Sequence, residues 1–207
     1  MIINIRGTSG SGKTYAIRAL MKSLEQYGTQ SVIYRDNGKI MAHCCFYKAQ
    51  PVYILGDYQS GDCGGCDRFK EDMQNYICSL VRHFSMFGHV VFEGLIISHI
   101  YSRYVALDAE MREAGDKCVW LFMDTPLDVC KSNVANRRAA HRTKRALDIT
   151  NTEHKFADTN RCYEKMLKAG MDARILHYGD NMASQLLRVL DEDYIPLSAS
   201  YRKDSFR

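Results

Sequence analysis

Residues 7–14 have the composition and spacing of a phosphate-binding loop. They match G-x-x-x-x-G-K-[ST] at every fixed position. In such a loop, glycines let successive backbone N–H groups point at a phosphate chain, and the helix that follows adds a favourable dipole. The lysine reaches the β- and γ-phosphates, and the hydroxyl ligates Mg²⁺. We therefore expect a nucleotide and Mg²⁺ to be held by Gly7, Thr8, Ser9, Gly10, Ser11, Gly12, Lys13 and Thr14.

The sequence around this loop favours that interpretation over an ordinary glycine- and serine-rich turn. Residues 1–6 form a short apolar run rich in isoleucine, which is typical of a buried strand. Apolar residues after the loop recur at helical spacing from Ala16 to Tyr27, and Gly28 supplies a stop. A strand, a glycine-rich loop and a helix are the order in which the motif functions.

Acidic residues at strand ends supply the next candidates. Glu93 follows the short apolar run 89–92, where a carboxylate can face Mg²⁺ or a water bound to it. Transfer to a hydroxyl also needs a base that holds the acceptor in line. Asp36, Asp62, Asp67 and Glu93 are candidates for this base, with Asp36 and Asp67 equally favoured. Asp36 can instead be a turn residue, and Asp67 can instead cap a helix.

Basic residues are concentrated between Lys131 and Arg145. They can form a solvated helix face, a lid that closes over the phosphates, or a nucleic-acid contact. After a phosphate loop, the lid is the favoured interpretation for Arg137 and Arg138. Arg142, Lys144 and Arg145 can belong to the lid or contact nucleic acid.

Strands and helices alternate along the chain, which predicts a three-layer α/β fold with a parallel sheet. Ligands bind beyond the carboxyl ends of such strands, which is where the loop and the candidate acids fall. Expected strands cover 1–6, 31–35, 39–47, 52–57, 89–92, 119–123 and 174–178, and expected helices begin near 15, 67, 98, 125, 152 and 182. Residues 49–51 are expected to separate the two strands of a hairpin.

The bulk composition is that of a globular protein. The chain has 207 residues and a net charge of +4, too small a charge to indicate nucleic acid by itself. We expect no signal peptide, because a strand begins at Met1, and no membrane span, because no apolar run is long enough. The expected location is the reducing cytoplasm, where disulfides are uncommon.

Cysteine spacing raises the possibility of zinc. The chain has eight cysteines, and Cys63 and Cys66 form a C-x-x-C pair. Together with Cys44 and Cys45 they could supply four thiolate ligands. The spacing differs from that of two zinc knuckles, so buried or near-surface thiols are the favoured alternative.

Switch GTPases carry the same kind of loop but are disfavoured. Residues 62–65 match D-x-x-G, yet they follow a loop instead of a strand. The guanine-reading N-K-x-D pattern is not found, since residues 143–146 lack its aspartate.

Several sequence blocks resemble bacteriophage kinases that phosphorylate 5-hydroxymethyluracil in DNA, within the nucleoside monophosphate kinase-like group. These blocks are the phosphate loop, Ile54–Tyr58, Cys63–Asp67, Gly88–Leu95, Leu121–Cys130 and the pair Arg137 and Arg138, and they span about residues 1–170. The resemblance implies ATP as donor, Mg²⁺ as cofactor and the base hydroxymethyl group in DNA as acceptor. It also implies the cytoplasm of a phage host as the location.

The resemblance also shapes the expected organisation of the chain. A single P-loop kinase domain would cover residues 1–195, with a hairpin or acceptor insertion at about 39–66, an arginine-rich lid at about 137–150 and a polar tail at 196–207. A lifted base could be gripped by the aromatic residues near 46–69, although aromatic residues in hairpins more often pack in a core. A kinase of free nucleosides or nucleotides is the first alternative, and a non-catalytic ATP-binding protein associated with DNA is a more distant one. The sequence does not determine the oligomeric state.

Overall fold

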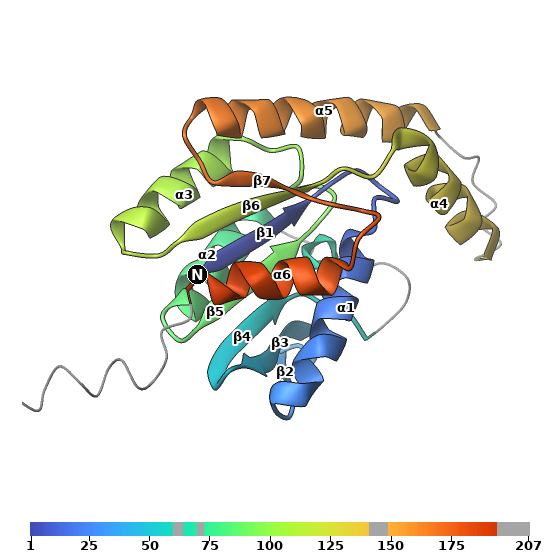
Figure 1. Cartoon of the computed structure of the whole chain (residues 1–207). Helices are drawn as coiled ribbons and strands as arrows, with labels where there is room; N and C mark the ends of the chain where they lie inside the picture. The colour runs from blue at the N-terminus through green and yellow to red at the C-terminus, as the bar shows by residue number, and fades with distance from the viewer. Residues whose placement is uncertain (60–63, 70–72, 141–148, 194–207) are drawn as a thin grey trace, which may run out of the picture.

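The structure is a computed structural model, and it describes residues 1–59, 64–69, 73–140 and 149–193. These residues form one seven-stranded sheet with helices on both faces (Figure 1). The strands lie in the order β2-β3-β4-β5-β1-β6-β7. Their bounds are β1 Ile2–Arg6, β2 Ser31–Tyr34, β3 Ile40–Tyr47, β4 Gln50–Leu55, β5 His89–Glu93, β6 Cys118–Met123 and β7 Ala173–Leu176.

The five strands from β4 to β7 in this order are parallel, and β2 and β3 extend the sheet as antiparallel strands. Strand β1 lies between β5 and β6, with Ile5 opposite both Glu93 and Leu121. Because parallel strands end at the same edge, this register places the loop after β1 beside the last residue of β5. The expected three-layer α/β fold is confirmed.

Helices α1 (Lys13–Leu24) and α6 (Met182–Asp191) cover one face of the sheet, and α2 (Met73–Ser85), α3 (Ser102–Glu113) and α5 (Ile149–Lys168) cover the other. Helix α4 (Leu127–Ala140) lies beyond the carboxyl ends of the strands (Figure 1). Short 3₁₀ helices span Glu25–Tyr27 and Cys66–Arg68. In the part of the chain that the structure describes, no helix is both long and apolar enough to cross a membrane.

Strand β1 shows why the central strands lack an alternating sequence pattern. Ile3 and Ile5 pack under α1 and α6, whereas Ile2 packs under the helices of the opposite face. Both faces are covered, so isoleucines suit positions on either face and do not alternate with exposed polar residues; Asn4 and Arg6, the two polar residues of the strand, are buried as well. Burial of apolar surface stabilises a fold by about 25 cal/mol per Å². The apolar side chains packed on both faces of the sheet are therefore the main source of its stability.

Two local predictions were wrong. The hairpin turn consists of Lys48 and Ala49, which both have positive φ (48° and 69°), as a tight two-residue hairpin requires. Gln50 and Pro51 are part of β4, and β4 pairs with β5, so both strands of the hairpin belong to the seven-stranded sheet.

The helix expected from Asp67 also begins later than predicted. Asp67 lies in the 3₁₀ helix Cys66–Arg68, Phe69 is extended, and the described part of α2 starts at Met73. Asp67 therefore does not cap α2. Its side chain has other partners at the site.

Candidate active site

The loop after β1 has the curvature that phosphate binding needs. Gly10 and Gly12 have φ of 78° and 95°, in the left-handed region that favours glycine. A Cβ atom on Gly10 would lie 2.2 Å from the Cys130 carbonyl oxygen, so a larger residue is excluded there by α4 as well. Helix α1 begins at Lys13, so the loop leads directly into a helix N-terminus of the kind that attracts anions.

Side chains from outside the loop hold it in this shape. Thr125 donates a hydrogen bond to the Ser11 carbonyl (2.7 Å), and Asn133 donates one to the Gly10 carbonyl (2.9 Å). The Thr8 hydroxyl donates to the Thr152 carbonyl on α5 (3.1 Å). The loop is thus tied to α4 and α5, and its conformation is set before a ligand binds.

Lys13 is buried and bends back over the loop. Its Nζ donates to the carbonyls of Gly7 (2.7 Å) and Thr8 (3.0 Å). Burial lowers its pKa, and the nearby Glu93 carboxylate opposes that shift. The residue also lines the cavity described below, where a phosphate oxygen could replace these carbonyls as its partner.

Thr14 and Glu93 meet where α1 starts and β5 ends. The Thr14 hydroxyl donates to Glu93 Oε1 at 2.9 Å. Glu93 is only 2% exposed, and burial raises its pKa to about 7, against the opposing effect of Lys13. A hydroxyl and a carboxylate are oxygen donors of the type that Mg²⁺ prefers, so the pair fits the expected metal.

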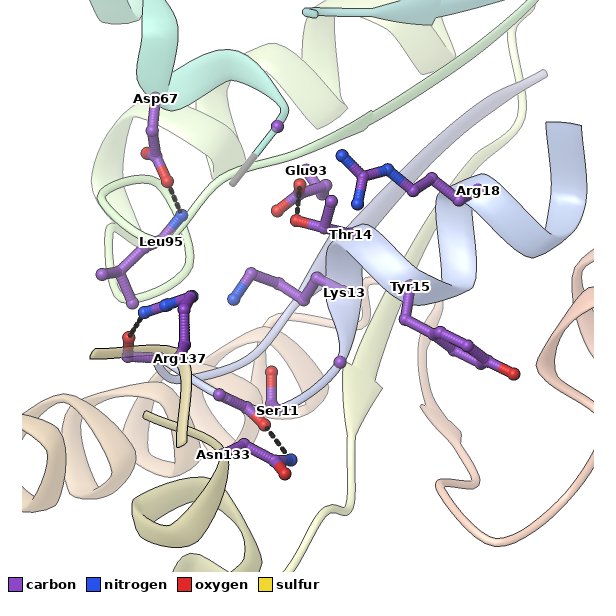
Figure 2. Close-up of a pocket in the computed structure, with 14 residues that line it drawn as sticks. Ser11, Lys13, Thr14, Tyr15, Arg18, Asp67, Glu93, Leu95, Asn133 and Arg137 are labelled. Carbon is purple, nitrogen blue, oxygen red and sulfur yellow. Dashed lines mark hydrogen bonds between the residues drawn. The ribbon is translucent and has the colours of Figure 1, made fainter. Parts of the chain in front are cut away.

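These groups border one cavity of about 310 Å³ (Figure 2). Figure 2 shows Lys13, Thr14, Glu93, Asp67 and Arg137 arranged around the same space. The loop from Ser9 to Thr14 forms one wall, and Asp67, Glu93 and Leu95 form another. Most of the predicted site residues are therefore brought together.

Asp67 and Asp36 are placed very differently. Asp67 lines the cavity, and its carboxylate accepts hydrogen bonds from the N–H groups of Leu95 (2.5 Å) and Ile96 (3.0 Å). Asp36 is exposed after β2 at the far edge of the sheet and does not line the cavity. Of these two candidate bases, only Asp67 is near the loop, and Asp62 lies outside the described residues.

The two arginines of the expected lid lie at the end of α4. Arg137 lines the main cavity and donates from Nη2 to the Ser9 hydroxyl at 3.3 Å. Arg138 lines a smaller neighbouring cavity. Arg142, Lys144 and Arg145 lie outside the described residues, as does the polar tail.

The structure does not assemble the possible zinc site and agrees with the favoured alternative of separate thiols. Cys45 packs in the core under α1 and α6, whereas Cys66 packs in the core on the opposite face of the sheet. Cys44 is half-buried on β3, and Cys63 lies outside the described residues. Within residues 1–59, 64–69, 73–140 and 149–193, no group of three or more His, Cys, Asp or Glu side chains could hold a metal ion.

The aromatic residues near the hairpin are mostly core residues. Tyr47, Tyr58 and Phe69 are at most 5% exposed, and Tyr53 stacks on Phe84. Phe46 is half-buried beside Gly28. These five side chains follow the core alternative and do not line the main cavity.

One buried side chain near the site was missed by the sequence analysis. Arg6, the last residue of β1, is fully buried with its guanidinium 4.8 Å from the ring centres of both Tyr104 and Trp120. It donates to Asn4 Oδ1 (2.6 Å) and to the Ile100 carbonyl (2.9 Å). Burial lowers its pKa to about 10, so the side chain is still charged at neutral pH. A charged residue directly before the loop, in a strand that is mostly isoleucine, was the available signal.

A mostly parallel sheet with this loop, an acid at the end of the adjacent strand and Arg137 at the same cavity is the arrangement of a P-loop phosphotransferase. Residues 1–178 match the sequence model of a family described as "5-hmdU DNA kinase". The chain belongs to this family and is a kinase, as the resemblance implied.

Individual relatives agree with the family. A protein of Pseudomonas phage PaMx11 named 5-hmdU DNA kinase is 36% identical over 177 residues, which are 82% of this chain and 87% of that protein. One of Pseudomonas phage M6 with the same name is 30% identical over 185 residues, 85% of this chain and 90% of that protein. Among solved structures, a shikimate kinase from Acinetobacter baumannii aligns over 94% of both chains with 12% identity and a TM-score of 0.44.

Proposed function

We propose that this chain transfers the γ-phosphoryl group of ATP to the hydroxymethyl group of 5-hydroxymethyluracil in DNA, with Mg²⁺ as cofactor. The observation that carries the proposal is the hydrogen bond between Thr14 and Glu93 inside the cavity that the phosphate loop borders. It joins the two expected Mg²⁺ ligands within the space available for a triphosphate. The names of the phage relatives supply the acceptor.

The phosphates of the donor have residues suited to hold them. The N–H groups of the loop and the Lys13 ammonium would bind the β- and γ-phosphates. The N–H groups lie at a helix N-terminus, where their partial positive charge attracts anions, and Lys13 adds a full charge. Thr14 and Glu93 would hold Mg²⁺, which when bound neutralises charge on those phosphates. Arg137 faces the same cavity from α4 and would stabilise the charge that develops on the transferred group.

Asp67 is the residue we assign to the acceptor. Its carboxylate would accept the hydroxyl proton as the hydroxymethyl oxygen attacks the γ-phosphorus. The bond from that phosphorus to the β–γ bridging oxygen breaks, and the leaving ADP takes the electron pair. The two N–H groups that hold the Asp67 carboxylate fix its orientation, which favours an in-line arrangement.

The test is phosphoryl transfer from labelled ATP to two matched oligonucleotides, one containing a single 5-hydroxymethyluracil and one containing thymine in its place. We expect label only in the first, only with Mg²⁺ present, and loss of at least about 100-fold in rate for Lys13→Ala. A panel of free nucleosides and nucleotides is assayed in parallel.

The alternatives predict different results. Label in the free compounds but not in DNA would replace the acceptor with a free nucleoside or nucleotide. No transfer to any acceptor, with ATP still bound, would favour a non-catalytic role. An in vivo function that survives Lys13→Ala would point the same way.

A further inference from the structure

A second, smaller cavity of about 80 Å³ adjoins the main one. Ser9, Leu95 and Arg137 line both cavities, so these residues form the boundary between the two spaces. The far side of the small cavity is formed by α5, through Asn151, Thr152 and Lys155. No role has yet been assigned to this α5 surface.

The lining of the small cavity is positively charged. It includes Arg137, Arg138 and Lys155, and none of the described residues that line it is acidic. The nearest acid along α5, Glu153, forms an ion pair with Lys131 at 2.6 Å. Three cations beside one small space favour an anionic ligand.

The two cavities differ in size. The small cavity has a volume of about 80 Å³, against about 310 Å³ for the main cavity. The small cavity is therefore suited to the smaller anionic group, a single phosphate. The main cavity, which is nearly four times larger, is the one that can contain a triphosphate.

We propose that the small cavity binds a backbone phosphate of the DNA next to the target nucleotide. The proposal rests on the function proposed above and identifies the part of the DNA that the enzyme grips. A base lifted from the stack stays attached to its flanking phosphates, so a site that receives the base also needs cations for at least one of them. Phosphate contacts of this kind fix register without reading sequence.

The fold sets the spacing between this site and the donor. Thr152, in the first turn of α5, accepts a hydrogen bond from Thr8 of the phosphate loop. Arg137 contacts Ser9, the next residue of the same loop. The loop that binds the donor is therefore tied to both helices that line the small cavity, and the two anions are held at a defined separation.

The test compares Lys155→Gln with Lys168→Gln. Both substitutions remove one positive charge from α5, but Lys168 is exposed near the other end of the helix and does not line the cavity. We expect Lys155→Gln to raise KM for a 5-hydroxymethyluracil oligonucleotide roughly 10- to 100-fold, as loss of a charged hydrogen bond would. The slope of log KM against log salt should become shallower by about one unit. KM for ATP should stay within twofold of the wild-type value in Lys155→Gln. Lys168→Gln should match wild type in KM for the oligonucleotide, in the salt dependence of that KM and in KM for ATP.

A chemical change in the DNA sharpens the test. Replacing single flanking phosphates with neutral methylphosphonates should, at one position, raise KM for the wild-type enzyme by a similar factor. The same replacement should not raise KM further in Lys155→Gln, because the interaction is already lost. Lys155→Arg should restore sensitivity to that position. If Lys155→Gln folds poorly, Lys155→Met keeps the aliphatic stem and is compared with Lys155→Arg.

Four outcomes would overturn the inference. A raised KM for ATP with an unchanged KM for DNA would assign the cavity to the donor. Independent, multiplicative effects of the lysine and of every methylphosphonate would show that they do not contact one another. Unchanged kinetics in Lys155→Gln, with the wild-type enzyme active on DNA, would refute the inference while leaving the proposed function intact. A wild-type enzyme inactive on the DNA would refute both.

Discussion

The Thr14 hydroxyl and the Glu93 carboxylate are joined by a 2.9 Å hydrogen bond, although 79 residues separate them in the sequence. The contact follows from two features of the fold. Pairing of β1 with β5 places Ile5 opposite Glu93, and the loop then returns the chain to the start of α1. The carboxylate is thereby buried beside Lys13, and its ionisation is linked to the stability of the protein.

The first prediction concerns this linkage. Because burial raises the pKa of Glu93 to about 7 from an ordinary value near 4.5, the folded protein keeps a proton that the unfolded chain releases between these pH values. The free energy of unfolding without metal should therefore fall as pH rises from 4.5 to 7. Glu93→Gln should abolish this fall and be more stable than wild type at pH 8, by about 3 kcal/mol. Chemical denaturation across this pH range measures it.

The matched control is Glu164→Gln on the exposed surface of α5, which should keep the wild-type pH dependence. Adding Mg²⁺ with a nucleotide should stabilise wild type more at pH 8 than at pH 6, since the ionised carboxylate binds the metal, and should stabilise Glu93→Gln much less. Parallel stability curves for wild type and Glu93→Gln would contradict the burial of an ionisable carboxylate here.

A second prediction uses the glycine that makes room for Glu93. A Cβ atom on Gly65 would lie 2.5 Å from Glu93 Oε1, and the residue has φ of 84°. Gly65→Ala should displace the carboxylate from Thr14 and lower kcat on the order of 100-fold, as small misplacements in active sites do. Steady-state kinetics at saturating ATP and Mg²⁺ measure the effect.

Gly38→Ala separates backbone strain from displacement of Glu93. Gly38 has a similar φ of 73°, but nothing lies within 4 Å of a Cβ added there. This variant should lose about 1 kcal/mol of stability and keep its kcat. Equal losses of activity in both variants would mean that strain alone, not displacement of Glu93, explains the result.

The loop and Glu93 could be predicted from the sequence because their signals are local. A glycine-rich motif between a strand and a helix identifies itself, and an acid that ends an apolar run has few alternatives. Asp36 carries the same local signal, yet β2 is three strands away from β5. Strand order is set by packing across the whole sheet, and a single sequence does not encode it in any one segment.

The roles of Asp67 and Arg6 could not be predicted from local sequence signals. Asp67 precedes an amphipathic segment and reads as its cap, but the N–H groups it accepts from belong to Leu95 and Ile96, on the loop after β5. Arg6 lies in a strand covered on both faces, where periodicity gives no sign of which neighbours can accommodate a charge. In both cases the decisive partners are distant in sequence and close only after folding.

The third prediction concerns Arg6. Its removal leaves the Ile100 carbonyl and Asn4 Oδ1 without their donor, and leaves a gap beside the rings of Tyr104 and Trp120. Arg6→Met should therefore destabilise the protein by roughly 2–4 kcal/mol, measured by urea unfolding. Arg6→Lys should recover little of the lost stability, because an ammonium group cannot stack on the rings as a planar guanidinium does and has fewer donors.

Arg161→Gln, at an exposed side chain, is the control and should change stability by less than about 1 kcal/mol. A fully stable Arg6→Met would show that the aromatic residues repack without the cation.

The last prediction distinguishes the two acids that the sequence left equally favoured. Asp67→Asn keeps the size of the side chain but cannot take a proton, so kcat should fall about 10²- to 10⁴-fold with little change in KM for ATP. Asp36→Asn should be indistinguishable from wild type, because Asp36 is exposed and outside the cavity. Steady-state kinetics with the modified oligonucleotide supply both numbers.

A purely structural role for Asp67 predicts a different pattern. An asparagine turned to keep one oxygen acceptor must direct its NH₂ group toward the second N–H, so the Leu95–Ile96 turn would be weakened in either case. If that weakening were the whole effect, activity would recover at temperatures well below the melting point of the variant, where the turn is folded. A loss of kcat that persists there, with normal ATP binding, would show that the carboxylate itself acts on the hydroxyl. Full activity of folded Asp67→Asn would instead exclude it as the base.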